Sequence, residues 1–137
     1  DKFQAQVGFR PAPDNAAVNS LVAAIKATHG ETPIVAHSQG GAITAAALKQ
    51  LSNEGFDLSH LKVTTMGSAE FHFPPGPQYE HRVHANDLVP MLAGGRMEYY
   101  YFNPLTLAKH LVTGEVKIFP TFNPLEAHSA DNYFKDF

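Results

Sequence analysis

The chain has 137 residues, 44% of them hydrophobic and 17% charged, which is the size and composition of one globular domain. Its formal charge of −3 includes no basic surplus, which argues against a general nucleic-acid-binding protein. The absence of cysteine excludes disulfides, zinc–thiolate sites and a cysteine nucleophile, and it leaves the localisation unknown. The sequence has no run of about 18 apolar residues, so no transmembrane segment is expected.

The first third of the chain predicts a strand followed by a helix. Apolar residues alternate over residues 3–9, as in a half-buried strand. Helical spacing of apolar residues then predicts a helix over residues 16–28, with Asp14 or Asn15 as its N-cap and Gly30 at its end.

A second strand and helix follow directly. The short apolar run 32–36 is typical of a buried parallel strand, and the alanine-rich segment 40–54 predicts a helix that ends at Gly55. Further strands are predicted over residues 61–66, 81–85 and 115–119, with the aromatic segment 99–102 as an additional candidate.

This alternation predicts an α/β fold with a mostly parallel sheet and helices on both faces. The proline-rich segment 74–77 is interpreted as a loop, because neither side of it has enough chain for a separate core. We therefore expect residues 1–137 to form a single domain.

The strongest functional signal is Ala36-His37-Ser38-Gln39-Gly40-Gly41, at a predicted strand-to-helix junction. A tight turn there would lift the Ser38 hydroxyl clear of the sheet, and it requires small residues two positions before and after the serine. Ala36 and Gly40 meet that requirement, as in the nucleophile elbow G-x-S-x-G. The alternative is that Ser38 only caps the helix, but a cap does not explain the small residues around it.

A serine nucleophile needs a general base and a carboxylate that orients it. Asp87 follows the predicted strand 81–85, where open α/β sheets place their active sites, and it is the candidate acid. His128 follows the last predicted strand and is the candidate base. Asp57 precedes a strand and Asp131 lies too close to His128, so neither is favoured as the acid.

The chain has eight histidines, and several of them could suggest a metal site. His81 and His84 are three residues apart on a predicted strand and so face opposite sides, which argues against shared coordination with His72. We expect structural or solvated roles for these three, with no metal and no cofactor. His37, next to the serine, is expected to pack or hydrogen-bond within the elbow.

The oxyanion hole of such a site uses backbone N–H groups. The N–H of Gln39 would be the first donor, at a helix N-terminus. The second would come from the loop after the first strand, where Ala12 can donate but the prolines beside it cannot.

With these residues in place, the chain resembles the class 3 lipases, the fungal-type family of α/β-hydrolases. The segments that are similar run from Val7 to Tyr133 in family order: G-F-R-P-A, I-V-A-H-S-Q-G-G-A, V-T-T-M-G-S-A, R-V-H-A-N-D-L-V-P and A-H-S-A-D-N-Y. The resemblance implies a minimal α/β-hydrolase fold and a Ser38–Asp87–His128 triad that forms an acyl-enzyme on Ser38.

The chain departs from this family pattern in three ways. Ala36 stands where glycine is usual, and Pro11-Ala12 stands where the family has glycine followed by serine or threonine. The chain also begins near the strand before the oxyanion loop, so we expect a form without the family's lid. An exposed sheet edge is then expected to be covered in a homo-oligomer.

The sequence thus predicts a serine carboxylic-ester hydrolase, esterase- or lipase-like, that acts on a small ester or a lipid. Candidate substrate-pocket residues are apolar side chains near the site, each of which could equally be core: Phe71, Phe73, Leu88, Met91 and Leu92. The alternatives are an acyltransferase or thioesterase with the same triad, or an inactive lipase-like binding module.

Overall fold

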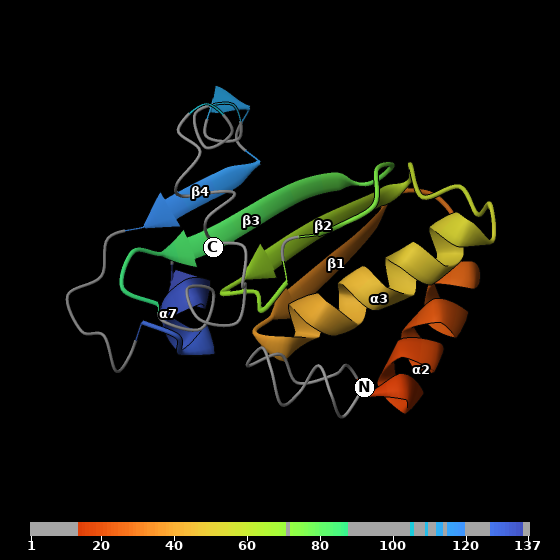
Figure 1. The fold of residues 1–137 in the computed structure, drawn as a ribbon, viewed down its shortest axis with the longest axis horizontal. Helices are drawn as coiled ribbons and strands as arrows, with labels where there is room; N and C mark the ends of the chain where they lie inside the picture. Colours follow the sequence, from red (N-terminus) through yellow and green to blue (C-terminus); the bar gives the residue numbers. More distant parts are fainter. Residues whose placement is uncertain are drawn as a thin grey trace.

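The computed structural model describes residues 14–70, 72–87, 105, 109, 112–113, 115–119 and 127–135. Its centre is one sheet of four parallel strands in the order β1-β2-β3-β4, so the chain belongs to the α/β class (Figure 1). The strands are β1 (Thr32–His37), β2 (Leu61–Met66), β3 (Gln78–His84) and β4 (Val116–Phe119). The strands predicted over 3–9 and 99–102 lie outside the described residues.

Three of these strands agree closely with the prediction, and β3 differs. The structure starts β3 at Gln78, three residues before the predicted start, and ends it at His84. The early start is hard to see in the sequence because Tyr79 and Val83 are the only apolar residues of β3, and polar His81 stands between them in the inward-facing register. The ladder with β4 continues for one bond past the strand, since the N–H of Ala85 donates to the carbonyl of Phe119 at 2.8 Å.

Helix α2 (Asn15–Lys26) begins where the sequence places it. The carboxylate of Asp14 accepts a 3.0 Å hydrogen bond from the N–H of Ala16, so Asp14 is the N-cap. The helix ends two residues earlier than predicted, with Ala27 as its C-cap. The Thr28 hydroxyl then donates to the carbonyl of Ile25 at 2.7 Å and takes up part of the helix end.

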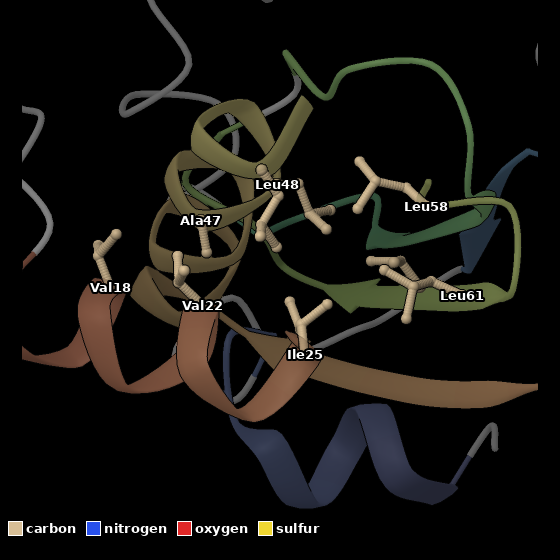
Figure 2. Close-up of a cluster of buried hydrophobic side chains, with 9 residues drawn as sticks. Val18, Val22, Ile25, Ala47, Leu48, Leu58 and Leu61 are labelled. Carbon is tan, nitrogen blue, oxygen red and sulfur yellow. The ribbon is translucent and has the colours of Figure 1, made fainter. Parts of the chain in front are cut away.

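Helix α3 (Gln39–Asn53) follows β1 with Ser38 alone between them and leads back toward β2. Apolar side chains of α2 and α3 pack onto the sheet in a cluster that also takes in the loop before β2 (Figure 2). The buried members of this core cluster are Val18, Val22, Ile25, Ala47, Leu48, Leu51, Leu58, Leu61 and Val63. Leu61 and Val63 alternate along β2, so the cluster covers one face of the sheet.

The opposite face of the sheet is contacted by a short helix, α7 (Ala130–Lys135). His84 lies next to Val83 in β3 and therefore points to the other face, where its ring stacks on Tyr133 of α7 with centroids 4.0 Å apart. Figure 2 shows α7 on the far side of β1 from the core cluster. Helices thus contact both faces, as the sequence predicts.

The carboxyl ends of the strands meet at one edge of the sheet. In Figure 1 the strand arrowheads point toward α7. Ser38 follows β1, Gly67 follows β2, and Asp87 closes a turn after β3 through a 3.0 Å bond from its N–H to the carbonyl of His84. This edge is where parallel sheets usually bind ligands. Within the described part of the chain, no helix has both the length and the apolar character needed to cross a membrane.

Candidate active site

Three side chains that are far apart in the sequence form one hydrogen-bonded chain at this edge. His128 Nε2 lies 2.7 Å from Ser38 Oγ, across 90 residues of sequence. His128 Nδ1 lies 2.9 Å from each carboxylate oxygen of Asp87. The residues that the sequence nominates as nucleophile, base and acid are therefore within direct hydrogen-bonding distance of one another.

The partners of His128 fix which ring nitrogen carries the proton. An ionised carboxylate only accepts hydrogen bonds, so Nδ1 carries the hydrogen that faces Asp87. In the neutral ring Nε2 then presents a lone pair to Ser38, whose hydroxyl donates to it. This is the tautomer that can take a proton from serine.

Ser38 has the backbone conformation of a sharp turn. Its φ of 54° and ψ of −122° match the first central position of a type II′ turn, which glycine normally occupies. For a residue with a Cβ such a conformation costs about 1–3 kcal/mol and persists only where the surroundings enforce it. Here they do, because the Ser38 N–H donates to the carbonyl of Met66, and the Ser38 carbonyl accepts from Gly41 and Ala69.

The same geometry excludes the interpretation of Ser38 as a simple helix cap. Ser38 precedes α3 but makes no side-chain capping bond to the helix. Its hydroxyl is hydrogen-bonded to His128 instead. A capping serine bonds to an N–H in the first turn, so the structure contradicts this alternative.

The structure gives different weight to the small residues around Ser38. A Cβ added at Gly40 would lie 3.7 Å from the Cβ of Ala36, which is an ordinary van der Waals contact, so the two positions face each other and an alanine would fit at position 40. A Cβ at Gly41 would lie 2.0 Å from Ser68 Oγ, which leaves no room for any side chain there. α3 can start this close to Ser68, in the segment after β2, because Gly41 lacks a side chain.

Asp87 is fully buried, and its carboxylate has a partner on each oxygen. Besides His128, the Tyr133 hydroxyl donates to Oδ2 at 2.6 Å. That hydroxyl also accepts a 2.9 Å bond from the N–H of His84. Among the described residues no buried side-chain polar atom lacks a hydrogen-bond partner, so the burial of this carboxylate is compensated.

Gly67 lies next to Asp87, Tyr133 and His128. Its φ is +54°, and a Cβ at this position would lie 2.6 Å from Asp87 Oδ2, 3.0 Å from Tyr133 Cε2 and 3.1 Å from His128 Nδ1. No side chain fits at those distances without displacing its neighbours. The absence of a Cβ at Gly67 therefore allows Asp87, His128 and Tyr133 to converge.

The other residues predicted for the site have three different outcomes. Gln39 is the first residue of α3, so its N–H has no acceptor within the helix and is placed next to Ser38. Phe73 packs at the margin of the core cluster, with its ring 5.3 Å from Tyr79 and 5.1 Å from His81. The remaining predicted residues lie outside the described residues: Ala12, Phe71, Leu88, Met91 and Leu92.

The histidines considered for a metal site have separate partners. His72 Nδ1 contacts the carboxylate of Glu70 at 3.2 Å, and His81 Nδ1 contacts the Thr65 hydroxyl at 2.7 Å. His84 Nδ1 contacts the carbonyl of Ala127 at 2.8 Å. No group of three or more possible metal-binding side chains occurs within the described ranges.

The sequence assigned no role to two residues of the site, Tyr133 and Gly67. Both lie in segments quoted for the family resemblance, the first in A-H-S-A-D-N-Y and the second in V-T-T-M-G-S-A. Those segments were the available signal, but the contacts of Tyr133 and Gly67 depend on how distant strands meet.

Comparison of the chain with protein-family models, with curated proteins and with solved structures gives no match in any of the three.

Proposed function

We propose that the protein is a serine carboxylic-ester hydrolase with Ser38 as nucleophile, His128 as general base and Asp87 as the orienting acid. The observation that supports this most strongly is the unbroken hydrogen-bonded chain Asp87–His128–Ser38. It occurs at a serine that directly follows the carboxyl end of β1 and whose backbone is strained by a φ of 54°. Structural strain at a polar residue is typical of functional sites.

The first half of the reaction forms an acyl-enzyme. Ser38 Oγ attacks the ester carbonyl carbon while its proton passes to His128 Nε2, and the carbonyl electrons move onto oxygen. When the tetrahedral intermediate collapses, the bond to the alkoxy oxygen breaks and His128 returns the proton to the departing alcohol. Asp87 stays ionised throughout and stabilises the charged imidazole.

The second half releases the acid. Water attacks the acyl carbon and gives a proton to His128, and the bond from the carbon to Ser38 Oγ then breaks as that proton returns to serine. In both halves the negative oxygen is stabilised by the N–H of Gln39, at the positive end of the 15-residue helix α3. A second donor at Ala12 remains a prediction.

The chain order of the site supports an α/β-hydrolase fold of minimal, class 3 lipase-like form as part of the proposal. Nucleophile, acid and base follow β1, β3 and β4 in that order, as in α/β-hydrolases. The substrate class that we propose is a small ester or a lipid ester.

The test measures hydrolysis of p-nitrophenyl esters with short and long acyl chains by the parent and by Ser38→Ala. Ser52→Ala, on the exposed side of the last turn of α3, is the matched control. We expect the parent and the control to be active and Ser38→Ala to lose at least about a thousandfold in kcat/KM. Labelling by a fluorophosphonate should likewise need Ser38.

The possible results separate this proposal from its alternatives. A preference for acyl-chain length would distinguish esterase from lipase-like behaviour. Faster hydrolysis of thioesters than of oxygen esters would indicate a thioesterase. Faster transfer of the acyl group to an added alcohol than to water would indicate an acyltransferase. A folded parent that is as inert as Ser38→Ala on all these substrates and is not labelled would refute the enzyme proposal and favour a binding module.

A further inference from the structure

Two histidines from different strands hold the segment that carries His128. His37 is the last residue of β1, and its Nε2 lies 2.7 Å from the main-chain carbonyl oxygen of His128 itself. His84 is the last residue of β3, and its Nδ1 lies 2.8 Å from the carbonyl oxygen of Ala127. These contacts span 91 and 43 residues of sequence.

The acceptors show which nitrogen of each ring carries a hydrogen. A carbonyl oxygen only accepts, so His37 must carry its hydrogen on Nε2 and His84 on Nδ1. Each ring therefore acts as a fixed N–H donor. His128 also donates, from Nδ1 to Asp87, but it differs in offering a lone pair on Nε2 to Ser38.

The two accepting carbonyls lie on either side of one Cα atom. The carbonyl of Ala127 belongs to the peptide plane before His128, and the carbonyl of His128 belongs to the plane after it. Restraining the oxygen of each plane limits φ and ψ of His128, and with them the direction of its Cα–Cβ bond. Only the side-chain torsions remain, and the bond from Nδ1 to Asp87 sets those.

His84 is itself held on both sides. Its ring stacks on Tyr133 at 4.0 Å with 5° between the planes, and its backbone N–H donates to the hydroxyl of Tyr133. That hydroxyl donates to Asp87. His84 thus contacts both the segment that carries His128 and Tyr133, the residue that donates to Asp87. His37 is half-buried, with its ring centroid 4.9 Å from that of His128.

We infer that His37 and His84 are positioning residues that jointly orient the His128 imidazole between Asp87 and Ser38. This inference rests on the proposed function for its kinetic consequence, although the geometry that it describes can be tested without a substrate. The kinetic effect follows because a catalytic group displaced by about 1 Å can lose about a hundredfold in rate.

The experiment compares pairs of variants that differ in the donor but hardly in size. His37→Gln places an amide N–H near the position of Nε2, whereas His37→Met has similar length and no donor. His84→Asn and His84→Leu form the corresponding pair for Nδ1. His29→Gln is the control, because His29 is exposed and precedes the amino end of β1.

We expect His37→Met and His84→Leu to lower kcat on p-nitrophenyl acetate about 10- to 100-fold with KM unchanged. His37→Gln and His84→Asn should recover most of that loss, and His29→Gln should match the parent. The second measurement is the low-field proton resonance of His128 Nδ1–H, assigned by its loss in His128→Gln. It should shift or broaden in the Met and Leu variants and persist in the Gln and Asn variants.

The outcomes distinguish the two proposals. If the parent shows no turnover, or turnover that Ser38→Ala retains, the proposed function is refuted. The proton resonance of His128 still tests the positioning role in that case. Unchanged kcat and an unchanged resonance in His37→Met and His84→Leu would overturn the positioning role. Equal losses within each pair, with no rescue by the amides, would also overturn it. The half-buried His37 pair decides the question if His84→Leu does not fold.

Discussion

At the scale of single residues, the site depends on one missing side chain. Gly67 leaves room for Asp87, Tyr133 and His128 to come together, at distances where a Cβ would meet all three. A residue in the core can often yield to an added methyl group by a small shift. Here the nearest atoms belong to a carboxylate and two rings that are tied to one another by hydrogen bonds, so no neighbour can move alone.

We therefore predict that Gly67→Ala disrupts the site more than it disrupts the fold. Overpacking of this kind costs about 1–3 kcal/mol, to which the positive φ adds strain. Hydrolysis should fall at least about a hundredfold, because the added methyl displaces Asp87 or His128. The assays are ester hydrolysis and thermal unfolding. Gly30→Ala is the control, because φ is also positive at Gly30 but an added Cβ there would have no neighbouring atom within 4 Å. Equal activity of the two variants would contradict the role given to Gly67.

The residue scale also marks the limit of inference from the sequence. Ser38 could be nominated because its requirements are local, with small residues two positions to either side and a strand before a helix. Asp87 and His128 followed from chain order. The contacts of His37 and His84 had no local signal, because their partners arrive from 91 and 43 residues away.

At the scale of elements, β4 is attached to β3 by charge as well as by its ladder. Glu80 of β3 lies 2.8 Å from the Lys117 ammonium of β4 and also contacts the Arg82 guanidinium. Burial by itself would raise the pKa of Glu80, but the hydrogen bonds from Lys117 and Arg82 outweigh it and hold the pKa below its ordinary value of 4.5.

The direction of this pKa shift predicts a dependence of stability on pH. Because the folded state holds the lower pKa, the contribution of Glu80 is fully present above pH 4.5 and is lost as the pH falls through the folded-state pKa. Glu80→Gln should therefore lower the free energy of unfolding by less than about 1 kcal/mol at pH 7. The difference from the parent should shrink as the pH falls below 4.5.

Thermal unfolding of both proteins between pH 7 and pH 3 checks this prediction. Lys117→Met, which removes the partner and leaves the carboxylate, should show the same convergence with the parent at low pH. A difference between parent and Glu80→Gln that stays constant over the whole range would contradict it.

Element boundaries were predictable where a single apolar face decides them. The segment from α2 through β2 follows the sequence pattern to within two residues at each end, because its helices and strands all face the core cluster. β3 was harder to delimit, since Tyr79 and Val83 are its only apolar residues. Its start is set by pairing with β2, where Lys62 lies opposite Gln78.

At the scale of the whole molecule, stability and chemistry are located in different places. The core cluster lies between α2, α3 and the sheet, whereas the site lies at the carboxyl edge, where α7 meets β3 (Figures 1 and 2). The overall α/β arrangement could be predicted because right-handed crossovers leave few alternatives for strand, helix, strand. The cross-sheet supports of the site could not, since they require the register of four strands.

This separation predicts that core variants lose stability without losing the reaction. Leu48 is fully buried in α3, so Leu48→Ala should lower the free energy of unfolding by about 2–5 kcal/mol. At temperatures where the variant is folded, its kcat/KM should match that of the parent. Chemical denaturation and ester hydrolysis measure the two quantities. Leu105→Ala, at a side chain 83% exposed, is the control and should change stability by less than about 0.5 kcal/mol.

The backbone of Ser38 implies that selection for stability and selection for turnover favour different residues at this position. Glycine adopts its φ of 54° and ψ of −122° without steric cost, whereas every residue with a side chain is strained there. A library varied at position 38 and sorted only for resistance to heat should therefore enrich glycine. The same library sorted for ester hydrolysis should return serine, so selection for stability alone would act against the proposed nucleophile.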